Sequence, residues 1–331
     1  MRIYRLQTLG SIDGLIAGEA KVPVPGAGEV LVKVRATSLN FRDYAIVNGW
    51  FPVPIPQGRV PLSDGAGEIE AIGAGVSRFK VGDRVVNSFF PNWFGGTFNL
   101  MPQQYVIEHD GWLTEYKVLN AEALVSLPDY LSFEAGATLP CAAVTAWSAL
   151  AGVTASDTVL TQGTGGVSIF AIQLAKAKGA RVIATTSSLE KAERLRKLGA
   201  DHIIDYKANP TWGEAARRLT GGRGVDRIVE VGGPGTLPQS VKAIAYGGQI
   251  SLVGILAGAQ GGVEFMPLFQ SQARFQPIVI GSRRDLEDML GLMAQHEVQP
   301  CIDSTYAFGE VRKAWDHYTA RRLFGKVVIR H

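Results

Sequence analysis

Apolar and polar residues alternate in short runs over the first part of the chain, from residue 1 to about 124. Residues 29–35, 67–72 and 83–86 are examples, and glycine and proline separate such runs. Alternation with a period of two is typical of strands that bury one face, and frequent turn residues favour antiparallel neighbours. We therefore expect a small, largely antiparallel β domain here.

The pattern changes at about residue 125, where strand-like and helix-like runs begin to alternate. Apolar residues recur at helical spacing in residues 167–178. The strand-like runs are residues 158–161, 181–185, 226–231 and 249–253. Strands that alternate with helices predict βαβ units, so residues 125–281 should form a doubly wound parallel sheet of the α/β class.

The C-terminal part contains two helical patterns and a final strand. The helices are expected at 285–296 and near 311–320, and the strand at 326–330. A chain of 331 residues suits two domains, and the simplest arrangement lets this tail rejoin the first of them. The predicted domains are residues 1–124 completed by 282–331, and residues 125–281.

Composition and charge exclude several classes of partner. The formal net charge is +3, and the charged residues are interspersed along the chain. Nucleic-acid binding needs a basic stripe or patch, so nucleic acid is not an expected partner. The sequence has no run of about 18 apolar residues, and its N-terminus does not resemble a signal peptide, so we expect neither membrane insertion nor export.

Cys141 and Cys301 are the two cysteines of the chain. Two thiols cannot build a disulfide framework or a structural zinc site of four cysteines. This composition favours a reducing compartment, and we expect a cytoplasmic protein.

A glycine-rich segment, GTGGVS at residues 163–168, stands between the first strand and the first helix of the βαβ unit. Gly163 would make the tight turn, and Gly165 with Gly166 would let backbone N–H groups approach a pyrophosphate at the helix N-terminus. Ser168 replaces the usual third glycine but is small enough for close packing. The strand-turn-helix context favours dinucleotide binding over an incidental glycine turn. The expected contacts are Gly163, Thr164, Gly165, Gly166 and Val167.

The end of the second strand predicts which dinucleotide binds. An NAD enzyme would place a carboxylate there, whereas this chain has Thr186, Ser187 and Ser188. Hydroxyl groups can donate to a 2′-phosphate, and Lys191 follows one turn into the next helix. We therefore expect NADPH (NADP). The alternative interpretation is that Lys191 and its basic neighbours only form a solvated helix face.

Ordered motifs along nearly the whole chain resemble the medium-chain dehydrogenase/reductase superfamily, and most closely its zinc-independent branch of quinone-oxidoreductase-like and alcohol dehydrogenase-like proteins. They are residues 28–33, 40–43, 62–67, 79–84, 138–141, 163–167, 198–201, 221–226 and 324–328. The resemblance implies a GroES-like first domain, a Rossmann-type second domain, and a site in the cleft between them.

Departures from the zinc alcohol dehydrogenases predict that no metal is bound. At the three positions where the resemblance implies catalytic zinc ligands, this chain has Asn40, Ser63 and Cys141. Amide and hydroxyl oxygens are poor zinc ligands beside thiolate and imidazole. Cys141 alone should not hold the ion, and we expect it to be a small buried residue.

Without a metal, oriented donors must stabilise the charge that develops on the substrate oxygen. The candidates are Asn40, Arg42, Tyr44 and Ser63. Asn40 and Asp43 could instead fix their loop through backbone hydrogen bonds, which is the preferred interpretation for Asp43. The substrate pocket would be lined by aromatic residues that suit a planar conjugated substrate, although several could be ordinary core: Phe41, Trp50, Phe51, Phe90, Trp93 and Phe94.

The resemblance implies further cofactor contacts at Thr145, Tyr206, Val253, Gly254, Ile255, Phe324 and Lys326. The expected function is an NAD(P)-dependent oxidoreductase that transfers hydride from NADPH to a quinone or an α,β-unsaturated carbonyl. Direct interconversion of ketone and alcohol is one alternative, and an NADPH-binding regulatory or structural protein is another. An apolar strand at 275–281 would leave an open sheet edge, so a homodimer is expected.

Overall fold

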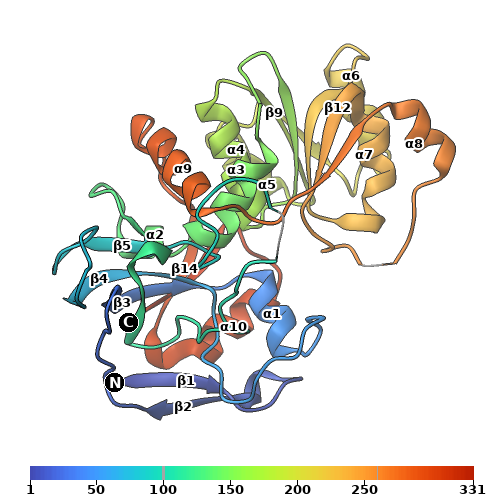
Figure 1. Ribbon diagram of the computed structural model, residues 1–331. Helices are drawn as coiled ribbons and strands as arrows, with labels where there is room; N and C mark the ends of the chain where they lie inside the picture. Colours follow the sequence, from blue (N-terminus) through green and yellow to red (C-terminus); the bar gives the residue numbers. More distant parts are fainter. Residues whose placement is uncertain (99–100, 259) are drawn as a thin grey trace. The chain divides into compact units, whose positions relative to one another are not determined.

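The computed structural model describes residues 1–98, 101–258 and 260–331. It consists of two compact units (Figure 1). Unit 1 contains Met1–Val144 and Gly281–His331, and unit 2 contains Thr145–Ile280.

Unit 1 is built on a mixed sheet in the order β14-β15-β3-β4-β5-β7, with β6 paired to β3. The strands are β3 (Glu29–Ser38), β4 (Asp64–Ile72), β5 (Arg84–Asn87), β6 (Tyr116–Asn120), β7 (Leu124–Ser126), β14 (Ile302–Ala307) and β15 (Lys326–Arg330). β1 (Arg2–Leu6) and β2 (Leu15–Glu19) form a separate antiparallel pair. Because β15 pairs antiparallel with β3, the C-terminal elements, red in Figure 1, continue the sheet of the blue N-terminal ones.

The helices of unit 1 are short, apart from α9 and α10. They are α1 (Phe41–Val47), α2 (Phe133–Gly136), the π-helix η3 (Leu139–Ala143), α9 (Arg283–Gln295), α10 (Val311–Thr319), and the 3-10 turns η1 (Ile12–Gly14), η2 (Ala121–Ala123) and η5 (Phe308–Glu310). α9 begins with a capping box, in which Ser282 Oγ accepts from the backbone N–H of Asp285 at 3.2 Å. Val30, Val32 and Trp315 belong to the buried core, which stabilises the sheet by removing apolar surface from water.

Unit 1 extends past residue 124. β7 pairs antiparallel with β5, and α2 packs on β3 and β4, so residues 125–144 lie with this unit. The sequence pattern predicts the domain boundary at residue 124, because the change from short strand-like runs to alternating strands and helices begins near there, and the structure places it at Val144.

Unit 2 is a parallel sheet in the order β10-β9-β8-β11-β12-β13. The strands are β8 (Thr158–Gln162), β9 (Arg181–Thr186), β10 (His202–Asp205), β11 (Val225–Glu230), β12 (Ile244–Leu252) and β13 (Arg274–Pro277). The helical elements are α3 (Val144–Ala149, which begins at the last residue of unit 1), α4 (Gly166–Ala177), α5 (Leu189–Lys197), α6 (Trp212–Leu219), η4 (Gly233–Gly235), α7 (Leu237–Ala243) and α8 (Phe265–Ser271). The order reverses between β8 and β11, the topology of a doubly wound Rossmann-type sheet, and the predicted fold class is confirmed.

The predicted apolar strand at 275–281 is shorter in the structure. β13 ends at Pro277, and Ile280 has φ 51°, which is incompatible with extended backbone. β13 nevertheless forms one edge of the sheet. Within the described ranges, the helices are too short or too polar to cross a lipid bilayer.

Candidate functional site

Asn40, directly before α1, is held by charged side chains that are distant in sequence. Its Nδ2 donates to Asp64 Oδ2 at 2.9 Å, and its Oδ1 accepts from the ammonium group of Lys326. Lys326 Nζ also donates to the carbonyl oxygen of Leu39 at 2.8 Å and lies 3.7 Å from Asp64 Oδ2. All these side chains are buried, so the amide of Asn40 has one fixed orientation.

Arg42 lies two residues further, on α1, and donates to three acceptors. Its Nη1 bonds to Ser63 Oγ at 2.6 Å, and its Nη2 bonds to Gln104 Oε1 at 3.1 Å and to the carbonyl oxygen of Tyr105 at 2.9 Å. Two rings cover the guanidinium, with centroids at 5.0 Å for Phe51 and 5.4 Å for Phe89. Burial lowers the pKa of Arg42, but an arginine pKa begins so far above neutrality that the group stays charged.

Asp43 links Asn40 to Ser63 through its two carboxylate oxygens. Its Oδ2 accepts from the backbone N–H of Asn40 at 3.0 Å, and its Oδ1 accepts from Ser63 Oγ at 3.2 Å. Asp43 therefore does fix the loop, as preferred from the sequence, and it also orients Ser63. Burial raises the pKa of Asp43 to about 6, although the nearby Arg42 lowers it.

Tyr44 lies apart from this network. Its ring packs edge-on against Trp50 at 5.2 Å and near Phe41 and Tyr318, at 6.1 and 6.5 Å between centroids. Within the described residues, its hydroxyl makes no hydrogen bond to the side chains around Asn40 and Arg42. Tyr44, one of the four donors expected from the sequence, is therefore not linked to that network by a hydrogen bond.

The expected aromatic lining separates into two groups in unit 1. Phe41, Tyr44 and Trp50 form one, and Phe90 with Trp93 belongs to the other, at 5.8 Å between centroids. Phe51 covers Arg42, and Phe94 lies 4.9 Å from the Arg283 guanidinium. Phe90 is fully buried, so it is ordinary core.

The donor set at the three metal-ligand positions does not suit zinc. Asn40 Oδ1 and Ser63 Oγ already accept from an ammonium and a guanidinium, and two fixed cations would repel a third. Burial and the nearby Asp64 raise the pKa of the Cys141 thiol, which opposes the thiolate that zinc requires. In the part of the chain that the structure describes, there is no group of three or more His, Cys, Asp or Glu side chains that could hold a metal ion.

The glycine-rich segment of unit 2 forms the loop expected from the sequence. Gly163 has φ 71°, and Gly165 precedes the twelve-residue helix α4. A Cβ atom added at either glycine would meet no atom within 4 Å, so the backbone there is open to a ligand. Ser168 is buried and donates to the carbonyl oxygen of Gln162 at 2.6 Å, so it completes the turn in place of a third glycine.

Behind this loop lies a buried carboxylate that the sequence analysis did not identify. Glu230 Oε1 accepts from the backbone N–H groups of Gly232 and Gly233 at 2.9 and 3.0 Å, and from Thr236 Oγ1 at 2.5 Å. Glu230 Oε2 accepts from Gln162 Nε2 at 2.7 Å and from Ser240 Oγ. The residue thus joins the ends of β8 and β11. The available signal was an acidic residue directly after the apolar pair Ile228–Val229, at the end of the strand-like run 226–231.

The hydroxyl-rich segment ends β9. Ser188 Oγ accepts from the backbone N–H of Lys191 at 3.3 Å and thereby caps α5. The backbone N–H of Tyr206 donates to the carbonyl oxygen of Thr186 at 3.0 Å. Thr186, Ser187, Ser188 and Tyr206 are therefore gathered at the carboxyl ends of β9 and β10.

The remaining expected cofactor residues lie in both units. Thr145 is buried in α3, and Val253, Gly254 and Ile255 follow β12, where the N–H of Val253 donates to Glu230 O at 2.8 Å. Phe324 is buried in unit 1. Lys326 lies with Asn40, so the structure places it in the polar cluster of unit 1, a position that the sequence did not indicate.

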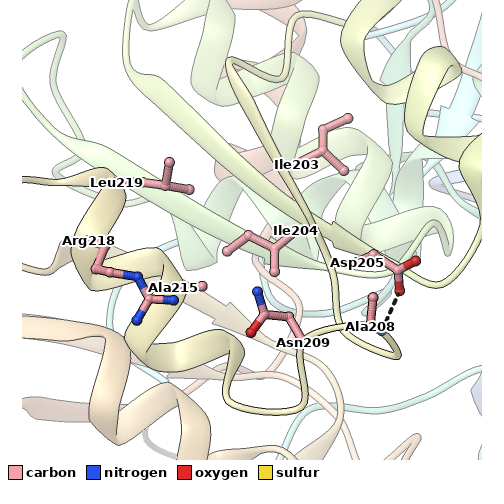
Figure 2. A pocket seen from close by; sticks show the side chains of 8 residues that line it. All are labelled: Ile203, Ile204, Asp205, Ala208, Asn209, Ala215, Arg218 and Leu219. Carbon is pink, nitrogen blue, oxygen red and sulfur yellow. Dashed lines mark hydrogen bonds between the residues drawn. The ribbon is translucent and has the colours of Figure 1, made fainter.

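A cavity of about 320 Å³ lies in unit 2 beside the edge strand β10 and α6 (Figure 2). Its lining is Ile203, Ile204, Asp205, Ala208, Asn209, Ala215, Arg218 and Leu219. Figure 2 shows the Asp205 carboxylate, which accepts a hydrogen bond from the backbone N–H of Ala208, across the cavity from Arg218. None of the predicted site residues lines this cavity, and Arg218 is exposed, so we do not assign it to the cofactor.

Comparisons with known proteins agree with both units. Residues 26–129 match the family model "Alcohol dehydrogenase GroES-like domain", and residues 166–295 match "Zinc-binding dehydrogenase". A zinc-type alcohol dehydrogenase-like protein of Schizosaccharomyces pombe is 40% identical over 97% of this chain and 96% of its own length. A quinone oxidoreductase of Pseudomonas aeruginosa is 33% identical over 92% of both chains.

Solved structures give the same result. A putative alcohol dehydrogenase from Sinorhizobium meliloti superposes with a TM-score of 0.95 and 39% identity, over 100% of this chain and 98% of that chain. A mycobacterial protein complexed with NADPH superposes with a TM-score of 0.84 and 26% identity, over 100% of both. The chain therefore belongs to the medium-chain dehydrogenase/reductase superfamily, whose members bind a nicotinamide cofactor, and it is an oxidoreductase.

Proposed function

We propose that the protein is an NADPH-dependent reductase that transfers hydride to a quinone or to the β-carbon of an α,β-unsaturated carbonyl, without zinc. The observation that carries this proposal is the pair of buried cations in unit 1. Lys326 and Arg42 donate to the side chains of Asn40 and Ser63, at two positions where zinc relatives are expected to hold the metal. The positive charge there belongs to the protein.

The loop from Gly163 to Val167 would hold the pyrophosphate at the N-terminus of α4. Thr145 and residues 253–255 would lie against the nicotinamide, which supplies the hydride when it is bound. The segment 186–188 offers hydroxyl groups and no carboxylate, and Lys191 supplies a cation, so a 2′-phosphate is favoured. The mycobacterial structure solved with NADPH agrees with this choice.

On the substrate side, Arg42 and Asn40 would stabilise the oxyanion. Arg42 carries a full charge, and its three acceptors keep the guanidinium from reorienting during the reaction. One hydrogen of Asn40 Nδ2 is used by Asp64, which leaves the second for the substrate. Conjugated acceptors suit such a site, because their product anion is only weakly basic.

Oxidation of a simple alcohol suits the cluster less well. A zinc ion lowers the pKa of a bound hydroxyl far enough to give an anion at neutral pH, and hydrogen-bond donors alone do so much less. The charge on Arg42 favours reduction of a simple ketone as a second candidate, because a guanidinium can stabilise an alkoxide. Several relatives are named alcohol dehydrogenases, for example one from Geobacillus stearothermophilus.

A stopped-flow screen of NADPH oxidation over quinones, enones, aldehydes and ketones tests the proposal. We expect rapid turnover of at least one conjugated acceptor and slow or absent oxidation of ethanol and isopropanol. Efficient alcohol oxidation without turnover of any quinone or enone would reverse the order of the two candidates. Tight NADPH binding with no turnover of any acceptor would favour a regulatory or structural protein.

We also propose that the protein is a homodimer joined along β13. This strand is one edge of the parallel sheet, and the neighbouring helix α8 exposes Phe265, Met266 and Phe269. A second copy of the chain would cover both features across a two-fold axis. Light scattering at low micromolar concentration should give twice the chain mass, and a monomer would refute the proposal.

A further inference from the structure

Two strained segments meet at Arg42. Each segment supplies an acceptor to the guanidinium and contains a neighbouring residue with positive φ. Ser63 follows Leu62 in one segment, and Tyr105 precedes Val106 in the other. Leu62 has φ 71° and Val106 has φ 75°, and both are fully buried. A β-branched residue with positive φ is a genuine outlier, and such strain persists only where surrounding contacts enforce it.

Lys117, on β6, contacts the ring of Tyr105 and the loop at Asp110 and Gly111, which is hydrogen-bonded to the Leu62 segment. Its Nζ donates to the carbonyl oxygens of Asp110 at 2.5 Å and Gly111 at 3.2 Å. It also lies 5.1 Å from the ring centroid of Tyr105 and 5.5 Å from that of Trp112. Among the described residues, no carboxylate lies within 4 Å of this ammonium, so its direct contacts are carbonyl dipoles and ring faces.

The acceptors of Lys117 belong to the stretch that fixes Leu62. The backbone N–H of Gly111 donates to Val60 O at 2.6 Å, and that of Trp112 donates to Leu62 O at 2.9 Å. The packing is so close that a Cβ atom on Gly111 would lie 2.3 Å from Leu62 O. The ammonium of Lys117 is therefore bonded to the loop that connects the Tyr105 segment to the Leu62 segment through backbone hydrogen bonds.

We infer that Lys117 is a positioning residue for Arg42: its buried ammonium fixes the segments that present Ser63 Oγ, Gln104 Oε1 and Tyr105 O to the guanidinium. The inference rests on the proposed function, in which Arg42 contacts the substrate oxygen. Lys117 itself would not touch the substrate.

The lowered pKa of Lys117 means that its charge costs folding stability, which agrees with a positioning role and not with a stabilising one. Burial lowers the pKa of Lys117 to about 8, with Arg59 lowering it further and Asp110 opposing the shift. Tyr105 and His109 are the other titratable groups beside it. Because the unfolded chain holds this proton more tightly, the charged lysine costs stability below about pH 8, and stability rises as pH increases from there toward 10.5.

The test compares Lys117→Met with the wild-type protein at pH 7. Methionine keeps the volume and removes the charge, so the thermal midpoint should stay the same or rise. We expect kcat to fall at least about 10-fold, because a small displacement of a catalytic group has effects of that order. The Kd for NADPH should not change, and Lys117→Arg should keep more activity than Lys117→Met.

Lys178→Met is the matched control, since Lys178 lies 4.4 Å from the ring of Trp147 in unit 2. Its kcat should equal that of the wild type. The wild-type kcat should also decline above about pH 8 as Lys117 loses its proton, and this decline should be missing in Lys117→Met.

A double-mutant cycle separates the inference from the proposed function. If Lys117 acts through Arg42, Lys117→Met should have no further effect on kcat in the Arg42→Ala background. An equal loss in both backgrounds, an unchanged kcat in the single variant, or a parallel loss of kcat and thermal midpoint would each overturn the inference. An unchanged kcat in Arg42→Ala would overturn the proposed function and the inference with it.

Discussion

The polar cluster of unit 1 and the glycine loop of unit 2 differ in the kind of chemical group that each would offer to a ligand. In unit 1, the candidate groups include charged side chains, with Asp43 and Asp64 buried beside Arg42 and Lys326. In unit 2, they are backbone N–H groups at open glycines, and the nearby carboxylate of Glu230 is bound entirely by neutral donors.

This difference determines what each region should respond to. Removal of one charge in unit 1 leaves its partner buried and uncompensated, so charge-changing substitutions and pH should have large effects there. The unit 2 loop depends on backbone geometry, so its ligand affinity should depend on the contacts that fix the loop and less on pH.

Arg42→Ala should have the largest effect. Loss of one preorganised donor to an oxyanion lowers kcat by about 100- to 1000-fold, and the same loss is expected here with an unchanged Kd for NADPH. Arg42→Lys keeps the charge but cannot reach all three acceptors, so its kcat should be intermediate. Steady-state kinetics with a quinone and fluorescence titration of NADPH would check this. A weakened NADPH affinity with normal kcat would contradict it.

Glu230→Gln should lower both the stability of unit 2 and its affinity for either dinucleotide. The new NH₂ group would face donors that now bond to the carboxylate, such as Gln162 Nε2, at a cost of about 1 to 3 kcal/mol in the free energy of unfolding. The Kd values for NADPH and NADH should rise together, because both dinucleotides use the loop. Urea unfolding and cofactor titration are the measurements. A rise confined to one cofactor would count against this role of Glu230.

Asp43 should make stability depend on acid pH. The folded pKa is raised from 3.8 to about 6, so the folded state holds the proton more tightly than the unfolded chain. The free energy of unfolding should therefore fall as pH rises from about 4 to 6, by an amount on the order of 3 kcal/mol. Asp43→Asn should reduce this slope in urea unfolding across the range. The pKa of Asp64 is also raised by burial, so part of the slope should remain. An identical slope in the variant would refute the assignment.

Lys191→Ala should have the most selective effect. A charge-assisted contact to the 2′-phosphate contributes about 1.5 to 3 kcal/mol, which corresponds to a rise of roughly 10- to 150-fold in the Kd for NADPH. The Kd for NADH should hardly change. Equal effects on both cofactors would show that the residue supports α5 and does not recognise the phosphate.

The same contrast explains what could be predicted from the sequence. The unit 2 loop is a local feature, because Gly163 and Gly165 sit between a strand and a helix that are adjacent in sequence. The strands β8, β9, β11 and β12 and the helix α4 were located for the same reason, since their hydrophobic periodicity is a property of short segments, whereas the short strand β10 was not predicted. Ser168 could be assigned from its size alone.

The polar cluster of unit 1 depends on contacts between distant segments. Asn40 and Ser63 were found by their positions in the motifs, but Lys326 is 286 residues from Asn40, and nothing local shows that the two side chains meet. The same holds for Gln104 and Tyr105 beside Arg42, which lie more than sixty positions along the chain. Such pairs follow from the register of β15 on β3 and the path of the loops.

We propose that protein cations, and not zinc, act on the carbonyl oxygen of the substrate. The most direct measurement is quinone or enone reduction by NADPH in protein treated with a strong chelator, with metal content determined by elemental analysis. We predict unchanged kcat at far less than one zinc per chain. A stoichiometric zinc ion whose removal abolishes activity, and whose return restores it, would contradict the account.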